Sequence, residues 1–480
     1  MLENWTFIRF FEMHSNQFGT LDTAMPPQVS ANPLISRFYS IWQVNMALEL
    51  ARGYINVPPS RNTRLLKNQF LMKIAIRDFD FLPPTSLSPE YKEIERETVE
   101  WLTQKQLIRG KEAVERLVRS KLTNLACRVH ITVKYDRMLW IAKLFSWLFM
   151  FDDQFDDSEL GQDKIQMYII FIALLNIFNT SETKRVTSEY AQNVESLMQN
   201  EKEGKITESF AEQMAQVQDS PIYISLSELW VEFCQTTSVE LQENVTSKFI
   251  KYLNAYIFEC DMRQMTRYPD VETYIKNRQD SGSMRLCLEA IEFIEEISLP
   301  KEIYTCELID TLRDQCINVV CWVNDIYSFE KEYENGDIHN LVMVLNQVKG
   351  ISIDESVKVV EHMVNKEMED FFETKAAVEK MVAGYPAQVK KDVAQYIIVL
   401  EAWCRGNMDW SIESARFKKG VQSKVYLEEI LSNKVASTES NNDWVARIKM
   451  LSQAKPALTV INGLFYGMIV IAALGLYHIG

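Results

Sequence analysis

Four carboxylates stand close together at the end of an apolar run. The run LWIAKLFSWLFMF is followed at once by Asp152, Asp153, Asp156 and Asp157. On a helix, residues four apart share a face, so these aspartates form two mutually repelling pairs. Clustered hard oxygen ligands beside an apolar surface suit Mg²⁺ that binds together with a phosphate-bearing substrate. We therefore predict divalent-cation binding by Asp152, Asp153 and Asp156; the alternative is a solvated helix end.

A second set of oxygen ligands lies further along the chain, in CWVNDIYSFEKEYENGD. Asn324, Ser328 and Glu332 are spaced by four residues, so a helix places all three on one face over about 12 Å. One amide oxygen, one hydroxyl and one carboxylate can hold Mg²⁺ and leave part of its coordination shell to phosphate oxygens. Lys331 is adjacent and is predicted to contact phosphate.

Long helices must carry both sets of ligands. No Gly or Pro occurs between Tyr135 and Leu160, which predicts one uninterrupted helix through the aspartates. Pro300 and Gly336 bracket a second helix that holds the other set. Apolar residues recur at spacings of three and four, and Gly 15 and Pro 13 are few for 480 residues, so we predict an all-α fold.

Composition and charge exclude several other classes of protein. The net charge of −15 leaves no basic stripe for a phosphate backbone, so we predict no nucleic-acid partner. The eight cysteines form no CxxC pair, and the five histidines form no HExxH motif. Zinc sites and Ser-His-Asp catalysis therefore lack their signatures, and the cysteines are typical of core residues in a reducing compartment.

The two motifs together resemble those of the class I terpene synthases, in the form common to microbial and animal enzymes rather than plant ones. The segment YIKNRQDSG is similar to the part of that family that senses diphosphate. The resemblance implies that Arg278 contacts diphosphate, and that Ser281 and Gly282 occupy a helix break whose carbonyl faces the nascent cation. It covers residues 78 to 419 and implies the all-α class I terpenoid synthase helical bundle.

The segment WCRGNMDWSIESARF resembles the closing segment of the same family. Arg416 stands where an Arg-Tyr pair normally contacts diphosphate, but Phe417 replaces the tyrosine, so one hydrogen bond to diphosphate is missing from the pattern. Aromatic faces stabilise positive charge, and we predict that some aromatic residues line the substrate pocket. The candidates that we name for that wall are Phe149, Trp403 and Trp410.

The resemblance implies an enzyme, a carbon-oxygen lyase that acts on a linear prenyl diphosphate. It would ionise farnesyl or geranylgeranyl diphosphate with three Mg²⁺ ions, for which Mn²⁺ is a substitute, and cyclise the carbocation to a sesquiterpene or diterpene. Diphosphate would be released. Two alternatives stay open: a trans-prenyl transferase, which would carry a second aspartate-rich motif in place of NDIYSFEKE, and a non-catalytic, membrane-tethered helical scaffold.

The sequence predicts four segments in all. The catalytic domain covers residues 78–430; an N-terminal helical extension, 1–77, precedes it, and a polar linker, 431–456, and a hydrophobic tail, 457–480, follow it. The uncharged run from Ala457 to Ile479 is long enough to span a bilayer, and the preceding basic residues would keep the catalytic domain in the cytoplasm, anchored to an intracellular membrane. The alternative is a helix packed on the bundle. Monomer and homodimer both remain open.

Overall fold

The computed structural model describes residues 82, 85–156, 159–200 and 210–417, and within these ranges the only regular elements are helices. This confirms the predicted all-α fold. The α-helices and two short 3-10 helices (η) are α3 (Tyr91–Gln104), α4 (Lys111–Ser120), α5 (Leu122–Val129), α6 (Tyr135–Asp156), η2 (Glu159–Gln162), α7 (Lys164–Leu175), α8 (Ser181–Asn200), α9 (Phe210–Gln218), α10 (Pro221–Cys234), α11 (Val239–Met265), α12 (Val271–Ser281), α13 (Met284–Glu289), α14 (Ile291–Glu295), α15 (Lys301–Tyr304), α16 (Glu307–Asn335), α17 (Leu341–Lys349), α18 (Ile353–Met381), η3 (Val382–Gly384) and α19 (Ala387–Glu413).

The predicted extension, linker and tail lie outside the described residues. None of the described helices is both long enough and apolar enough to cross a bilayer. The limits of the catalytic domain, and the membrane interpretation of the tail, therefore stay predictions.

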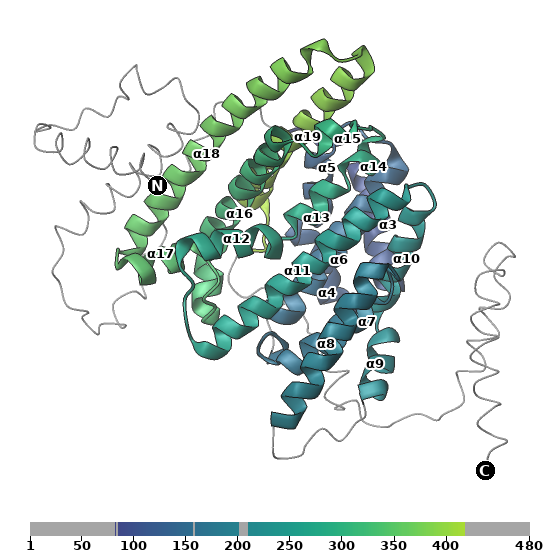
Figure 1. Ribbon diagram of the computed structural model, residues 1–480, viewed down its shortest axis with the longest axis vertical. Helices are drawn as coiled ribbons and strands as arrows, with labels where there is room; N and C mark the ends of the chain where they lie inside the picture. The colour runs from purple at the N-terminus through teal and green to yellow at the C-terminus, as the bar shows by residue number, and fades with distance from the viewer. Residues whose placement is uncertain (1–81, 83–84, 157–158, 201–209, 418–480) are drawn as a thin grey trace, which may run out of the picture. The chain divides into compact units, whose positions relative to one another are not determined.

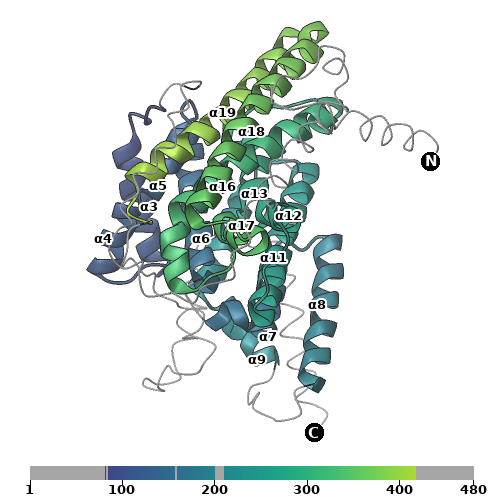
Figure 2. The ribbon, with the colours of Figure 1, turned by 90° about the vertical axis from the view of Figure 1, so that its left-hand side faces the viewer.

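The long helix α16 lies among several partners in the bundle. It packs against α18 on one side and α19 on another, and α19 in turn packs against α5. Across the bundle, α11 contacts α12, α13 and α7. The helices α6, α11, α16 and α19 thereby contribute the walls that carry the predicted site residues (Figures 1 and 2).

The helix with the aspartates is fixed by an aromatic cluster on its far side. Phe151 stacks on Trp147 at 5.0 Å between ring centroids, and Phe155 meets Phe151 edge-on at 4.9 Å. These rings are fully buried, and burying each one stabilises the fold by roughly 2 kcal/mol. The three rings recur every four residues and so share one face of α6. Their packing fixes the rotation of the helix, and this sets the direction in which the Asp152 carboxylate points.

The structure confirms that one helix carries the apolar run into the aspartates. The helix α6 runs without interruption from Tyr135 to Asp156, and the 3-10 helix η2 begins at Glu159. Residues 157 and 158 lie outside the described residues.

Two glycines permit close helix packing near the site. A Cβ atom on Gly406 of α19 would lie 3.1 Å from Val129 of α5, so a glycine lets these two helices approach. A Cβ atom on Gly282 would lie only 2.7 Å from the Cys321 sulfur of α16. Gly282 ends α12, and Ser283 with a φ of 57° turns the chain into α13, which gives the break that the sequence predicted there.

Candidate active site

A single cavity receives side chains from α6, α11, α16, α19 and the break between α12 and α13. It encloses about 1280 Å³ of empty space, including the part that opens to solvent. Among the predicted site residues, all but Asp153 and Asp156 line it: Phe149, Asp152, Arg278, Ser281, Gly282, Asn324, Ser328, Lys331, Glu332, Trp403, Trp410 and Arg416. Asp153 is buried beside the cavity, and the side chain of Asp156 is outside the described structure.

The aspartates of α6 are held by groups from two other elements. Arg416 Nη2 donates to Asp153 Oδ1 at 2.8 Å and lies 3.4 Å from Asp152 Oδ2. The Tyr256 hydroxyl of α11 donates to Asp152 Oδ1. Burial raises the pKa of Asp152, while the Arg416 guanidinium and the Tyr256 hydroxyl act in the opposite direction. In this structure, then, a protein cation offsets the repulsion between the neighbouring carboxylates.

The three oxygen ligands of α16 lie along the opposite wall. Asn340, which caps α17, donates through Nδ2 to Glu332 Oε2 at 2.8 Å and to the Asp325 carbonyl at 2.7 Å, and Ser328 Oγ lies 3.5 Å away. One buried amide thus contacts two of the three predicted ligands. Burial, with Asp337 and Asp325 adding repulsion, raises the pKa of Glu332 to about 7.

Arg278 connects the helix break to this wall. Its Nε donates to Asp325 Oδ1 at 2.9 Å, and its Nη2 donates to Asn324 Oδ1 at 2.9 Å. The fully buried Asp325 also accepts from the Tyr274 hydroxyl at 2.6 Å and from the Leu341 amide at 3.1 Å. Three separate elements therefore fix the guanidinium at the edge of the cavity, where an anion can reach it.

Comparison with known proteins agrees with this arrangement. The family model described as terpene synthase family 2, C-terminal metal binding, matches residues 143–370. Germacrene A synthase of Nostoc punctiforme is 26% identical over 342 residues, which cover 70% of this chain and 94% of that protein. Pristinol synthase of Streptomyces pristinaespiralis is 25% identical over 336 residues, which cover 70% of this chain and 82% of that protein. This chain belongs to the class I terpene synthases.

Solved structures show the same fold in other terpene synthases. Wild-type cucumene synthase superposes with a TM-score of 0.55 at 20% identity, covering 70% of this chain and 99% of that one. Germacradien-4-ol synthase from Streptomyces citricolor superposes with a TM-score of 0.55 at 19% identity, covering 68% of this chain and 96% of that one.

The donor atoms of this terpene synthase fit the divalent metal that its family implies. Asp152 and Asp153 offer carboxylates on one wall, and Asn324, Ser328 and Glu332 offer hard oxygens on the other. Such hard oxygens suit Mg²⁺. The raised pKa of Glu332 reflects a buried carboxylate whose charge a cation would stabilise.

Sequence reasoning missed several residues of this terpene synthase site. Asn340 and Tyr256 were not predicted, although an Asn directly before the apolar run LVMVL is a recognisable helix cap. Asp337 was missed too: burial would raise its pKa, but Arg263 and His339 hold that pKa below its usual range. No local pattern marks Tyr256, which lies in a long buried helix.

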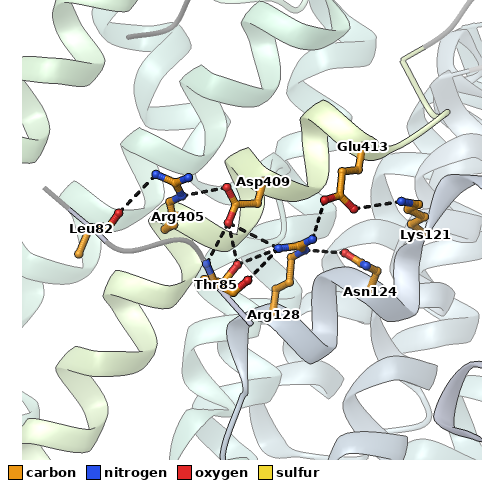
Figure 3. A network of polar contacts seen from close by, with 8 residues as sticks. All are labelled: Leu82, Thr85, Lys121, Asn124, Arg128, Arg405, Asp409 and Glu413. Carbon is orange, nitrogen blue, oxygen red and sulfur yellow. Dashed lines mark hydrogen bonds and ion pairs between the residues drawn. The ribbon is translucent and has the colours of Figure 1, made fainter. Parts of the chain in front are cut away.

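A polar network outside the cavity anchors the closing segment, Trp403 to Phe417 (Figure 3). Arg128 Nη2 donates to Glu413 at 2.8 Å, and its Nη1 donates to the Thr85 carbonyl at 3.1 Å. Asp409 accepts from the Thr85 hydroxyl at 2.9 Å and from Arg405 Nε at 2.8 Å. The network ties the end of α19, just before Arg416, to α5 and to the segment that precedes α3.

Proposed function

We propose that this terpene synthase converts farnesyl diphosphate to a cyclic sesquiterpene and releases diphosphate. The observation that carries the proposal is one cavity in which Arg278 and Arg416 face an apolar wall across the two sets of oxygen ligands. The relatives support a C15 substrate: the (+)-T-muurolol synthase of Roseiflexus castenholzii is described as cyclizing farnesyl diphosphate, and several from Postia placenta are named sesquiterpene synthases.

The bound diphosphate would lie at the polar end of the cavity. Arg278, Lys331 and Arg416 supply positive charge there, and charge that is already in place favours departure of a leaving group that becomes more negative. Because Arg416 pairs with Asp152 and Asp153 in the structure, we expect it to exchange at least one of these contacts for a phosphate oxygen. Arg278 can bind phosphate through the edge of its guanidinium that faces the cavity.

Divalent ions held by the two oxygen sets would neutralise the developing charge on the leaving group. We propose that Asp152, Asp153 and Asp156 serve on one wall, that Asn324, Ser328 and Glu332 serve on the other, and that three ions are bound. Asn340 orients Glu332 and Ser328 through its amide, and the Tyr256 hydroxyl orients Asp152. These contacts reduce the reorganisation that the ligands need before they can bind.

The apolar wall would shape and protect the carbocation. The ring centroids of Phe145 and Trp403 are 5.2 Å apart, and those of Phe149 and Trp410 are 5.5 Å apart. These two aromatic pairs line the cavity, and the Phe149 pair is the one next to Arg416. Their ring faces stabilise positive charge and exclude bulk water. The break at Gly282 also lines the cavity, and a carbonyl there, as the family resemblance implies, would add a dipole that stabilises the cation.

The test is incubation of the full chain with geranyl, farnesyl or geranylgeranyl diphosphate and Mg²⁺, followed by gas chromatography and mass spectrometry of an organic extract. We expect a cyclic C15 product from farnesyl diphosphate that disappears when a chelator is added. If only cyclic C20 products form, the substrate is geranylgeranyl diphosphate and not farnesyl diphosphate. Longer prenyl diphosphates would indicate chain elongation, and absence of every product would refute the proposal.

A further inference from the structure

Two residues of α19 present polar atoms to the apolar part of the cavity that have no hydrogen-bond partner among the described residues. The Trp403 indole N–H is buried and, among the described residues, finds no acceptor. Asn407, one turn further along α19, is 3% exposed and also lines the cavity. An unpaired buried N–H costs about 1–3 kcal/mol, so such a group in a roomy cavity is normally satisfied by a bound molecule.

The orientation of the Asn407 amide follows from its chemistry. Its Nδ2 donates to the Val320 carbonyl at 3.3 Å, and because a carbonyl can only accept, the nitrogen must face Val320. Its oxygen consequently points away from that contact and accepts no hydrogen bond from the residues the structure describes. Trp403 and Asn407 are four residues apart on one face of α19, so their Cβ atoms lie about 5–6 Å apart and the donor and the acceptor stand one turn from each other.

This donor and acceptor belong to the end of the cavity that is remote from the charged groups. Trp403 contacts Phe145, seven positions before Asp152 on α6, whereas Trp410 contacts Phe149, whose face is covered by Arg416. Val320, the partner of Asn407, precedes Asn324 by one turn on α16. On α6 and α16 the apolar residues thus precede the predicted metal ligands, and on α19 they precede Arg416.

We propose that Trp403 and Asn407 bind one water molecule that ends the reaction by adding to the carbocation, so that the product is a terpene alcohol. This inference rests on the proposed cyclisation of a prenyl diphosphate. Trp403 donates its N–H to the water oxygen, and the water donates one hydrogen to Asn407 Oδ1, which leaves a lone pair of the water directed into the cavity. A neutral donor and a neutral acceptor hold the water without offering a base strong enough to remove a proton from the cation.

The step balances with the species that the reaction provides. The water oxygen forms a C–O bond to the cationic carbon by donating its lone pair, and the resulting oxonium loses one proton. That proton passes to solvent water as the product leaves, so the overall reaction converts prenyl diphosphate and water to a terpene alcohol, diphosphate and one proton. No oxidant or reductant takes part. Because the water lies away from the diphosphate end, the hydroxyl group is placed on a carbon of the cyclised skeleton that derives from the isoprene units distal to the original diphosphate.

The experiment is turnover of farnesyl and geranylgeranyl diphosphate by the full chain with Mg²⁺ in ¹⁸O-labelled water, with products characterised by mass spectrometry and NMR. We expect a cyclic alcohol in which the hydroxyl oxygen comes from the labelled water and sits on a distal carbon. A cyclic hydrocarbon as the main product would overturn this inference and leave the proposed cyclisation standing. An acyclic alcohol hydroxylated near the former diphosphate would also overturn it, and absence of any product would refute the proposed function itself.

Two substitutions locate the water. Trp403→Phe keeps an aromatic face but removes the N–H, and Asn407→Leu keeps the volume but removes the acceptor. For each we expect about a tenfold fall in the ratio of alcohol to hydrocarbon, as for the loss of one hydrogen bond. The matched control is Trp140→Phe, because Trp140 is not among the residues that line the cavity and its N–H donates to the Leu229 carbonyl at 3.2 Å.

The control variant should keep the alcohol ratio of the wild type even if its rate changes. An unchanged ratio of alcohol to hydrocarbon in Trp403→Phe would show that Trp403 does not bind the water. An unchanged ratio in both Trp403→Phe and Asn407→Leu would overturn the proposal. Because only the product ratio is compared, a partial loss of folded protein in Asn407→Leu does not affect the outcome, and Trp403→Phe provides an independent measurement.

Discussion

The two walls that offer oxygen ligands are built in different ways. On α6, Asp152 and Asp153 are neutralised by Arg416, which comes from the closing segment beyond α19. On α16, the ligands are braced by Asn340 and Arg278, which come from neighbouring elements of the bundle. On the α6 wall, therefore, substrate binding must move Arg416 away from the aspartates. On the α16 wall, amide and guanidinium donors already orient the ligands.

This difference assigns separate tasks to the two walls. The α16 wall carries one full charge, so it gains little from a counter-ion but needs its neutral donors aligned before a metal arrives. The α6 wall carries several charges and cannot exist without a counter-ion, which Arg416 provides. We expect substitutions on the α16 wall to reduce metal binding directly, and substitutions around the α6 wall to act through the exchange of Arg416.

The largest effect should come from the ligands of α16 themselves. Glu332→Ala or Asn324→Ala should lower kcat/KM by about a thousandfold or more, because the charge stabilisation of the leaving group is lost. Helix content by circular dichroism should stay the same. Glu334→Ala is the matched control, since Glu334 is exposed on the same helix. If Glu332→Ala retains turnover, Glu332 is not a metal ligand.

Asn340 tests whether orientation of that wall matters. Asn340→Asp replaces the amide nitrogen with an oxygen, which would repel Glu332 and the Asp325 carbonyl. We expect Mg²⁺ affinity to fall by about 10–100-fold, as when the partner of a metal ligand is lost. Calorimetric titration of Mg²⁺ in the presence of inorganic diphosphate measures this without turnover.

A suitable comparison is Asn365→Ala on α18, where the amide contacts only its own helix at the Glu361 carbonyl. Equal Mg²⁺ affinity in Asn340→Asp and Asn365→Ala would show that the α16 wall does not depend on its brace.

These cases show how far sequence alone can go. The spacing of Asn324, Ser328 and Glu332 predicted one shared helix face because helical periodicity is local, and the structure places all three in the cavity. The role of Arg278 followed only from resemblance to a family, since nothing local marks it. Asn340 and Tyr256 could not be predicted, because their contacts depend on how separate helices pack.

The helix that carries the aspartates was predictable from local signals. No Gly or Pro interrupts the run that leads into the aspartates, and the structure has one helix from Tyr135 to Asp156. The overall bundle was predictable as well, because apolar periodicity over hundreds of residues averages out local errors.

The buried carboxylate of the α16 wall should make stability depend on pH when metal is absent. Because burial raises the pKa of Glu332 to about 7, the folded protein holds a proton that the unfolded chain loses near its ordinary pKa. Between about pH 4.5 and pH 7 this group should therefore reduce the free energy of unfolding as pH rises, by roughly 3 kcal/mol.

Urea unfolding in a chelator at several pH values measures this dependence for the wild type and for Glu332→Gln. The glutamine cannot titrate, so the difference between the two proteins isolates Glu332. A pH-independent difference would contradict the raised pKa.

On the α6 wall, Tyr256→Phe should have a milder effect. It removes the hydroxyl that donates to Asp152 but keeps the ring, which packs 5.1 Å from Phe155. Since Arg416 still compensates Asp152, we expect the Mg²⁺ concentration that gives half-maximal rate to rise only about three- to tenfold, as for one hydrogen bond. Tyr190→Phe is the control, because its hydroxyl bonds Asn254 away from the cavity. A larger effect than that of Asn340→Asp would reverse the proposed ranking of the two walls.

The smallest effect is expected at Phe417, next to the cation of the α6 wall. Its ring packs edge-on against Trp410 at 5.5 Å and lines the cavity, so Phe417→Tyr adds a hydroxyl without removing a contact. If that hydroxyl donates to diphosphate, as the family's Arg-Tyr pair does, KM for the prenyl diphosphate should fall by about two- to fivefold with kcat unchanged. An unchanged KM would mean that Arg416, once released from the aspartates, binds diphosphate sufficiently alone. A lower kcat would instead indicate that the hydroxyl bonds Asp152 or Asp153 and delays the exchange of Arg416.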